Sequence, residues 1–291
     1  MRRIFLLLLL ALPALAQSRI DCDTLDSRIL HEPVHYCVLL PDGYDSLAQK
    51  TTKYPVLYFL HGLGENEQSL FKSGGWNLVQ DLRQQRKIGE FFIVTPQAKA
   101  SFYVNSADGK VRYNDFFLEE FMPFIETKYR IDGNRRRRAV SGISMGGYGA
   151  FRFAFAYPER FAGVSAESAA LITASPHELD ATMRSGTPLS TILGGVFGNP
   201  INLTHWNANN PFVLARRNRF AIRKLAIDFN CGREDQYDFE DGAQALHRQL
   251  DSEGIKHEFH LYPGDHSASY FLSHLGELME FHSREFEQPS K

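Results

Sequence analysis

Cysteine is scarce in this chain, which has three among its 291 residues: Cys22, Cys37 and Cys231. Three cysteines cannot form the dense disulfide framework of many small secreted domains, so the fold must depend on a hydrophobic core. One of them must also stay unpaired within the chain. Cys22 and Cys37 can pair if they lie on neighbouring strands. The alternative is that all three are small buried side chains, and we expect no catalytic role for any of them.

An excess of charge of either sign is also missing. Lys and Arg (32) nearly balance Asp and Glu (34), which leaves a formal net charge of -2. A chain with this balance has no overall field to attract nucleic acid or an anionic membrane. Four consecutive arginines occupy residues 135–138, but they precede an expected core strand and no aromatic residues interrupt them. This pattern favours a solvated turn over a nucleic-acid site, so we expect small-molecule partners.

Long hydrophobic runs are absent except at the N-terminus. Two arginines are followed there by the apolar residues 4–12, by Pro13 and by Ala14-Leu15-Ala16. This arrangement predicts a secretory signal peptide, residues 1–16, with cleavage after Ala16. A membrane anchor would need about 20 apolar residues, and this run is shorter and is interrupted by Pro13. We therefore expect residues 17–291 to be exported to the periplasm or the medium, without a membrane span.

Cofactor motifs are missing as well. The sequence contains no H-E-x-x-H motif, EF-hand loop or dinucleotide fingerprint, so we expect no metal and no organic cofactor. It also has no internal repeat and no low-complexity linker. With 43% hydrophobic and 13% aromatic residues, the chain can bury a large core. We expect one domain.

Strand-like and helix-like stretches alternate along most of the chain. The predicted strands lie at about residues 34–40, 56–61, 91–95, 139–143, 163–167, 225–230 and 257–262. The predicted helices lie at about residues 77–87, 116–129, 147–157, 239–253 and 267–286, the fourth with Leu246 and Leu250 on one face. Several of the strands are continuous apolar runs, which is typical of buried parallel strands. The alternation predicts an α/β fold, with a mostly parallel central sheet and helices on both faces.

Residues 169–220 break this alternation. They are rich in Ser, Thr, Asn, Gly and Pro, with isolated apolar residues. We interpret them as an insertion over the carboxyl edge of the sheet. They form either a cap that walls the substrate site or a surface excursion without a role, and the first is favoured because loops this long are uncommon unless they are functional.

A short motif between a predicted strand and a predicted helix indicates the chemistry. Gly142-Ile143-Ser144-Met145-Gly146 matches G-x-S-x-G, the nucleophile elbow. Glycines are required two residues before and after the serine, because a Cβ at either position would collide with backbone in so tight a turn. The motif predicts that Ser144 is an exposed nucleophile.

A serine hydroxyl needs a base, and the base needs a carboxylate that orients it. In α/β-hydrolases these residues follow in the order Ser, acid, His. Asp235 follows an apolar strand and Gly232, and His266 lies in a turn after the last strand, so they are the predicted acid and base. The other acids weighed were Glu234, Asp228, Asp238 and Asp241, and the other histidines were His257, His260, His274 and His282.

The oxyanion of an acyl-transfer intermediate needs two backbone donors. The residue after the nucleophile, Met145, supplies one. The second should come from His61-Gly62-Leu63-Gly64, which follows an early strand, with Leu63 as the donor. His61 is expected to brace this loop rather than to accept a proton.

Three segments carry a resemblance to a known family: residues 54–62 (YPVLYFLHG), 142–150 (GISMGGYGA) and 262–267 (YPGDHS). Residues 38–45 (VLLPDGYD) and 157–161 (YPERF) support it. The chain thereby resembles the esterase D family of α/β-hydrolases. That family includes S-formylglutathione hydrolases, feruloyl and acetylxylan esterases, tributyrin-type esterases, enterochelin esterases and mycolyltransferases. The resemblance implies the triad Ser144, Asp235 and His266, with Leu63 and Met145 at the oxyanion hole.

These observations predict a secreted serine carboxylesterase that acts on short-chain acyl or aryl esters, with carbohydrate esters among the candidates. The export signal argues against a glutathione conjugate as substrate. The alternatives are an acyltransferase to a sugar or lipid hydroxyl and a non-catalytic binding module, which the intact triad disfavours. Four aromatic residues either line an acyl or sugar pocket or pack in the core: Trp76, Phe102, Tyr103 and Trp206.

Overall fold

An eight-stranded sheet forms the centre of the molecule. The computed structural model describes residues 19–184 and 186–287, so the predicted signal peptide lies outside the described residues. The strands are β1 (Ile20–Ser27), β2 (Glu32–Leu39), β3 (Val56–Leu60), β4 (Phe92–Pro96), β5 (Arg138–Ile143), β6 (Gly163–Glu167), β7 (Ala226–Gly232) and β8 (Glu258–Tyr262). Their order is β1-β2-β4-β3-β5-β6-β7-β8, antiparallel for the first two pairings and parallel from β4 onward. The seven predicted strands are confirmed, and β1 was missed.

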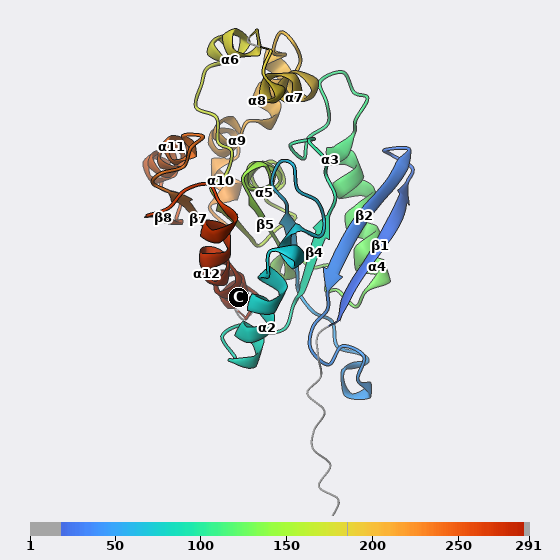
Figure 1. Cartoon of the computed structure of the whole chain (residues 1–291). Coiled ribbons are helices and arrows are strands. Elements are labelled where there is room, and N and C mark those ends of the chain that lie inside the picture. Colours follow the sequence, from blue (N-terminus) through green and yellow to red (C-terminus); the bar gives the residue numbers. More distant parts are fainter. Residues whose placement is uncertain (1–18, 185, 288–291) are drawn as a thin grey trace, which may run out of the picture.

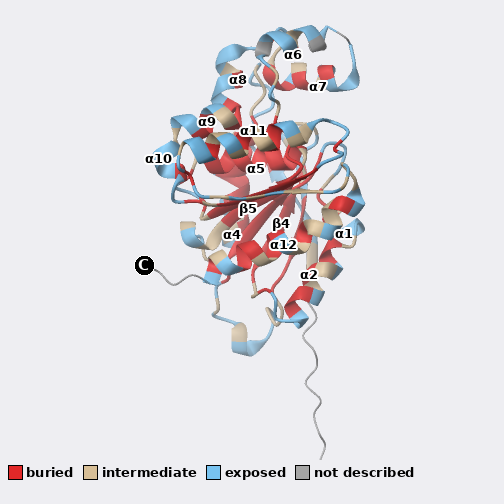
Figure 2. Ribbon diagram, turned by 90° about the vertical axis from the view of Figure 1, so that its left-hand side faces the viewer, coloured by how far each residue is buried: buried red, intermediate tan, exposed pale blue. Residues whose placement is uncertain are grey.

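Both faces of the sheet are covered, which explains why its strands are continuous apolar runs. In β3, Val56, Tyr58 and Leu60 enter one hydrophobic core, while Leu57 and Phe59 enter a second core on the opposite face. Every residue of β3 is buried. Figure 2 shows the buried sheet between two layers of helices. A strand with both faces buried cannot alternate apolar and polar residues.

The helices divide between these two faces. The principal ones are α2 (Gly75–Gln84), α4 (Met122–Lys128), α5 (Met145–Ala156), α11 (Phe239–Ser252) and α12 (Ala268–Glu287), with the shorter α1 (Ser69–Lys72), α3 (Tyr113–Asp115) and η2 (Phe116–Phe121). Helices α2 and α12 cover one face, and α5, α11 and the α3–α4 segment cover the other (Figure 1). The predicted helices are confirmed, and Leu246 and Leu250 of α11 are buried. Among the described residues, no helix combines the length and the hydropathy of a membrane span.

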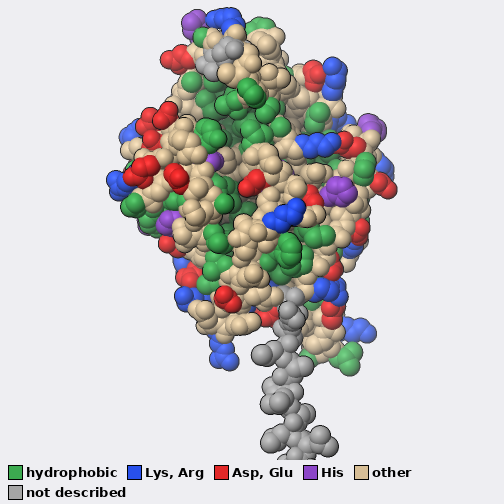
Figure 3. Space-filling model, viewed as in Figure 1, with side chains coloured by type: hydrophobic (Ala, Val, Ile, Leu, Met, Phe, Trp, Pro, Cys, Tyr) green, Lys and Arg blue, Asp and Glu red, His purple; other side chains and the backbone are tan. Residues whose placement is uncertain are grey.

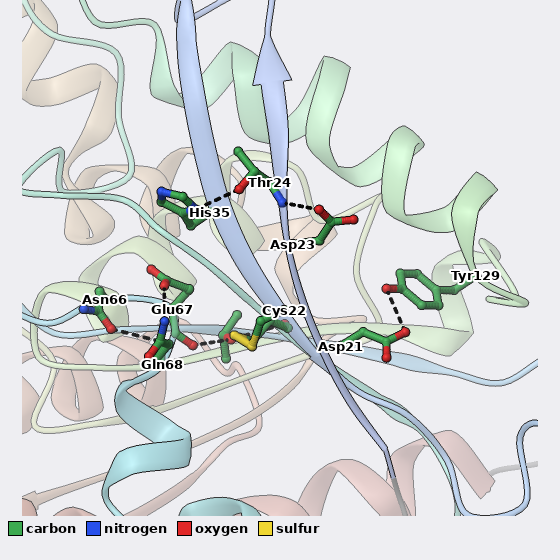
Figure 4. The surroundings of a disulfide bond; sticks show 11 residues. Asp21, Cys22, Asp23, Thr24, His35, Asn66, Glu67, Gln68 and Tyr129 are labelled. Carbon is green, nitrogen blue, oxygen red and sulfur yellow. Dashed lines mark hydrogen bonds between the residues drawn. A yellow bond between two sulfur atoms is a disulfide. The ribbon is translucent and has the colours of Figure 1, made fainter.

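A disulfide joins the edge strand β1 to β2. Cys22 and Cys37 are register partners in this antiparallel pair, and their sulfur atoms are bonded (Figure 4). The pairing that the sequence left open is therefore present, and Cys231 is free and buried. Strand β1 escaped prediction because half of its residues are exposed at the sheet edge, so it has no apolar run.

The insertion at residues 169–220 contains helices that the sequence analysis did not assign. They are α6 (Pro176–Met183), α7 (Pro188–Phe197), α8 (Leu203–Asn209), α9 (Pro211–Arg217) and α10 (Arg219–Ile222), the last of which ends just beyond the insertion. Three of them are preceded by the N-cap residues Thr187, Asn202 and Asn210, whose side chains accept hydrogen bonds from amides of the first turn. Thr and Asn are common both in loops and at helix N-caps, so their presence did not distinguish these short helices from loops. Helices α6 to α8 lie above the carboxyl ends of the parallel strands (Figure 1).

The arginine run forms the expected turn before β5. Arg135–Arg137 make one turn of 3-10 helix, η3, capped by the Asn134 side chain. The Arg135 guanidinium donates to the carbonyl oxygens of Pro158 and Lys224, and Arg138 donates to the Glu126 carboxylate at 2.7 Å. These side chains therefore tie neighbouring loops together.

Candidate active site

Ser144 lies in a strained turn between β5 and α5. Its backbone has φ 54° and ψ -116°, an unfavourable conformation for a residue with a Cβ. A Cβ on Gly142 would collide with the backbone of Gly146, and a Cβ on Gly146 would collide with the carbonyl group of Leu60. The Ser144 amide donates to the carbonyl oxygen of Glu167 at 3.0 Å, which anchors the turn to β6. The geometry is that of a nucleophile elbow.

Asp235 and His266 meet after strands β7 and β8. The Nδ1 atom of His266 lies 2.7 Å from Oδ2 of Asp235, whose other oxygen accepts the Tyr237 amide at 3.0 Å. Burial alone would raise the pKa of Asp235, but these two hydrogen bonds lower it below its usual value. Strands β5 to β8 run parallel, so Ser144, Asp235 and His266 all follow the same edge of the sheet.

His266 is fixed by neighbours that the sequence analysis did not identify. The Gln236 side chain accepts the His266 amide at 3.0 Å and donates to the His266 carbonyl oxygen at 3.3 Å. The rings of Tyr237, Phe239 and Phe271 stand nearly perpendicular to the imidazole, with centroids 5.0 to 5.4 Å away. The adjacency of Gln236 and Tyr237 to Asp235 was the signal that could have revealed them.

The competing acids have other positions. Glu234 Oε2 accepts the Gly264 amide at 2.5 Å and so holds the turn before His266. Asp228 lies within β7, while Asp238 occupies the N-cap position of α11 without a side-chain hydrogen bond to the helix, and Asp241 lies in its first turn. None of these carboxylates contacts the His266 imidazole.

The competing histidines also lie away from Asp235. His260 belongs to β8, and His257 immediately precedes that strand. His274 and His282 lie on α12, where His282 is buried and bonded to Ser165 at 2.7 Å. Within the described residues, the hydrogen bond that Asp235 makes to a histidine goes to His266.

His61 braces the loop after β3. Its Nε2 accepts the Ala98 amide at 2.9 Å, so its Nδ1 carries the proton and donates to the Gly62 carbonyl oxygen at 2.8 Å. Burial lowers the pKa of His61, which favours this neutral form. Glu65 accepts the Gly62 amide at 2.9 Å, and the Tyr103 hydroxyl donates to the His61 carbonyl oxygen at 3.0 Å. The expected bracing role of His61 matches these contacts.

The two expected oxyanion donors, Met145 and Leu63, come from separate segments, the start of α5 and the loop after β3. Met145 is the first residue of α5, where amide groups have no partner within the helix. The Gly62 amide is already bonded to Glu65, so Leu63, the next residue of the turn, remains the candidate for the second donor. The Gly62 backbone lies close to the elbow, since a Cβ on it would be 3.6 Å from Cβ of Ser144.

The four aromatic candidates for substrate contact are buried, in agreement with the second of the two alternatives, packing in the core. Trp76 is 2% exposed in the core between α2 and the sheet, and Tyr103 is fully buried. Phe102 packs edge-on against Tyr148 and Phe197, and Trp206 packs against Phe197. Burial of such large apolar surfaces stabilises the fold.

A cavity of about 390 Å³ lies beside the insertion. The β1–β2 hairpin, residues 97–113 and α7 line it, and Ala98, which bonds to His61, is among them. Ser144, Asp235 and His266 do not line this cavity. It adjoins the braced loop rather than the histidine–carboxylate pair, and the geometry of that pair identifies the candidate centre better than the cavity does. Figure 3 shows apolar side chains gathered in a hollow of the surface below α6–α8.

The model of a family described as "Putative esterase" matches residues 27–281. This chain belongs to that esterase family. It is 30% identical over 244 residues to Esterase Rv1288 of Mycobacterium tuberculosis, a match that covers 79% of this chain and 51% of the relative. The chain thus spans about half the length of this curated relative. It is also 24% identical over 264 residues to an acetyl esterase of Caldicellulosiruptor saccharolyticus, covering 89% of this chain and 96% of that one.

Solved structures agree with this membership. A ferulic acid esterase superposes with a TM-score of 0.78 at 28% identity, covering 93% of this chain and 99% of that one. The S-formylglutathione hydrolase FrmB of Staphylococcus aureus superposes with a TM-score of 0.73 at 20% identity, covering 92% and 99%. The second likeness concerns the fold alone. Together they confirm the predicted α/β-hydrolase fold for this family member.

Proposed function

We propose that this protein is a serine carboxylesterase in which Ser144, His266 and Asp235 act as a triad. The supporting observation is the 2.7 Å hydrogen bond between His266 and Asp235 at the sheet edge where the strained Ser144 turn also lies. That bond leaves the Nε2 atom of His266 to act as the base. Membership of the esterase family supports the same reaction.

The reaction proceeds through an acyl-enzyme. The Ser144 Oγ atom attacks the carbonyl carbon of the ester while its proton passes to Nε2 of His266. The amides of Leu63 and Met145 stabilise the oxyanion, and the alcohol leaves with the proton from His266. Water then attacks the acyl-enzyme while one of its protons passes to Nε2 of His266, and His266 transfers that proton to Ser144 as the carboxylic acid leaves. Asp235 stabilises the imidazolium in both halves.

We propose short-chain acyl or aryl esters as substrates. A ferulic acid esterase and an acetyl esterase are among the similar proteins, which supports both classes. The cavity beside α7 adjoins the braced loop through Ala98, and we assign to it the part of the substrate beyond the scissile bond. A panel of acetyl, butyryl, feruloyl and long-chain esters tests the proposed substrate class. If long-chain esters have the highest kcat/KM, the proposal of short-chain acyl or aryl esters is wrong.

We further propose that the protein acts outside the cytoplasm. The supporting observations are the pattern of residues 1–16, which predicts a signal peptide, and the Cys22–Cys37 disulfide, which is compatible with an oxidising compartment. N-terminal sequencing of protein recovered from the periplasm or the medium should begin at Gln17. Recovery of an intact N-terminus in the cytoplasm would contradict this.

The decisive experiment for the reaction compares Ser144→Ala with the wild type on p-nitrophenyl acetate. Loss of the nucleophile should lower kcat by at least about a thousandfold. Ser252→Ala, an exposed change on α11, is the matched control and should leave kcat unchanged. Equal turnover by the wild type and Ser144→Ala would refute the proposed nucleophile.

A further inference from the structure

Two histidines and an aspartate converge at one edge of the molecule, away from the candidate active site. His247 and Asp251 lie one turn apart near the end of α11, and His257 immediately precedes β8. Their potential ligand atoms all lie within 4.8 Å of one another. His247 Nδ1 is 2.7 Å from His257 Nε2, and Asp251 oxygens lie 3.5 Å from His247 Nε2 and 3.9 Å from His257 Nε2.

The imidazole of His257 is oriented in advance. Its side chain is 3% exposed, and its Nδ1 lies 2.8 Å from the carbonyl oxygen of Ile255. A carbonyl oxygen only accepts hydrogen bonds, so Nδ1 carries the proton and the lone pair of Nε2 faces the cluster. The Phe229 ring stacks on this imidazole at 5.8 Å. A histidine whose other nitrogen donates to a backbone carbonyl has the arrangement typical of metal ligands.

His247 completes an electron-rich pocket. If its Nδ1 donates to His257, a neutral imidazole turns the lone pair of Nε2 toward the Asp251 carboxylate, and two acceptors then face each other. A cation held by both histidines and the carboxylate removes that conflict. The Phe259 ring stacks on His247 at 4.8 Å, so this ring is also held in place.

We propose that His247, Asp251 and His257 bind a divalent transition-metal ion of the zinc type. Two imidazole nitrogens and one carboxylate oxygen, with water in the fourth position, form a set that suits Zn²⁺. Tetrahedral coordination at about 2.1 Å places two nitrogens roughly 3.4 Å apart, about 0.7 Å farther than the 2.7 Å observed. The side chains of His247 and Asp251 are 37% and 63% exposed, so they can move by that amount.

The ion would join the last turn of α11 to the edge strand β8. His257 lies at the amino end of β8, whereas His266 follows its carboxyl end, so the site is separate from the candidate active site. Helix α11 and β8 lie together at one side of the molecule in Figure 1. The proposed metal site therefore does not depend on the proposed function. The role of the ion is to stabilise the sheet edge.

The test uses the mature chain without a polyhistidine tag, which would itself bind metal. After equilibration with Zn²⁺ and gel filtration, we expect one zinc per chain by elemental analysis. Co²⁺ should give the visible absorption of a tetrahedral site. Zn²⁺ should also raise the thermal midpoint by several degrees, on the order expected for ligand in excess of Kd.

The variants His247→Gln and Asp251→Asn change exposed side chains and should leave the fold intact. Each should weaken Zn²⁺ binding at least tenfold and abolish the rise in thermal midpoint, with kcat/KM for p-nitrophenyl acetate unchanged. His260→Gln is the matched control, because His260 belongs to a different cluster with Asp228 and Glu258. It should retain one zinc per chain. Absence of zinc from the wild type, unaltered affinity in His247→Gln, or loss of zinc from His260→Gln would each overturn the proposal.

Discussion

At the scale of single residues, both oxygens of Asp235 already have partners. One accepts from His266 at 2.7 Å and the other from the Tyr237 amide at 3.0 Å. The neighbouring Glu234 is committed to the Gly264 amide. These two adjacent carboxylates therefore have different partners. The sequence favoured Asp235 over Glu234 as the acid, but it did not indicate what Glu234 binds.

The first prediction concerns Asp235→Asn. An amide has nearly the same shape as the carboxylate, but it cannot stabilise the imidazolium that forms when His266 takes the proton. We expect kcat on p-nitrophenyl acetate to fall by about 10³ to 10⁴. Glu234→Gln, with its bond to Gly264 weakened, should retain activity within about tenfold. A larger loss in Glu234→Gln than in Asp235→Asn would reverse the assignment of the acid.

The second prediction concerns residues 61–64, called here the oxyanion loop because Leu63 is its proposed donor. The Tyr103 hydroxyl donates to the His61 carbonyl oxygen and so holds this loop. Tyr103→Phe removes this bond within the core, which should cost about 1 kcal/mol of unfolding free energy. It should also lower kcat by roughly tenfold with KM little changed, because the loop amides lose their alignment.

Tyr58→Phe is the control for this change. Its hydroxyl donates to the Glu126 carboxylate at 3.1 Å, and Tyr58 does not line the cavity beside α7. It should lose similar stability and keep its kcat. Equal effects of both variants on kcat would show that Tyr103 does not position the oxyanion loop.

At the scale of elements, close backbone approach decides how β5 turns into α5. The Gly146 backbone lies against the carbonyl groups of Leu60 and His61 at the end of β3. Gly195, in α7 of the insertion, has open space around the position of a Cβ. The same residue type is therefore obligatory in one helix and replaceable in another.

The third prediction contrasts these two glycines. Gly146→Ala forces a collision with backbone that cannot move aside, so we expect little soluble folded protein and no esterase activity. Gly195→Ala should raise the unfolding free energy by about 0.5 to 1 kcal/mol, because alanine favours an exposed helix. Soluble expression, circular dichroism and urea titration measure both effects. A well-folded, active Gly146→Ala would contradict the packing at the elbow.

At the scale of the whole molecule, the face of the sheet under α12 buries acidic groups. Burial, together with the charges of Glu258 and Glu277, raises the pKa of Asp228 to about 7. Burial also raises the pKa of Glu167, whose carboxylate lies in the same region. These groups make the stability of the domain depend on pH.

The fourth prediction follows from Asp228. Because its pKa is higher in the folded than in the unfolded chain, the folded state holds the proton more tightly between about pH 4 and 7. Stability should therefore fall as pH rises through that range, by at most about 4 kcal/mol from this group. Asp228→Asn should be more stable than the wild type at pH 8 and equal to it at pH 4, by urea titration.

Asp81→Asn, at an exposed position of α2, is the control and should show no such difference. If Asp228→Asn has the same stability relative to the wild type at both pH values, Asp228 does not carry the raised pKa.

The sequence by itself determined the parallel strands, the helices beside them and the order of Ser144, Asp235 and His266. It could do so because strands buried on both faces are continuous apolar runs, and because the elbow requires glycine at fixed positions. The tertiary structure decided what depends on contacts between distant segments. These are the pairing of β1 with β2, the bonds from Gln236 and Tyr103, the burial of Trp76 and Phe102, and the His247–His257 contact. A polar or aromatic residue can pack in the core, brace a loop or contact a substrate. Which of these it does depends on its neighbours in space, and these come from segments far apart in the sequence.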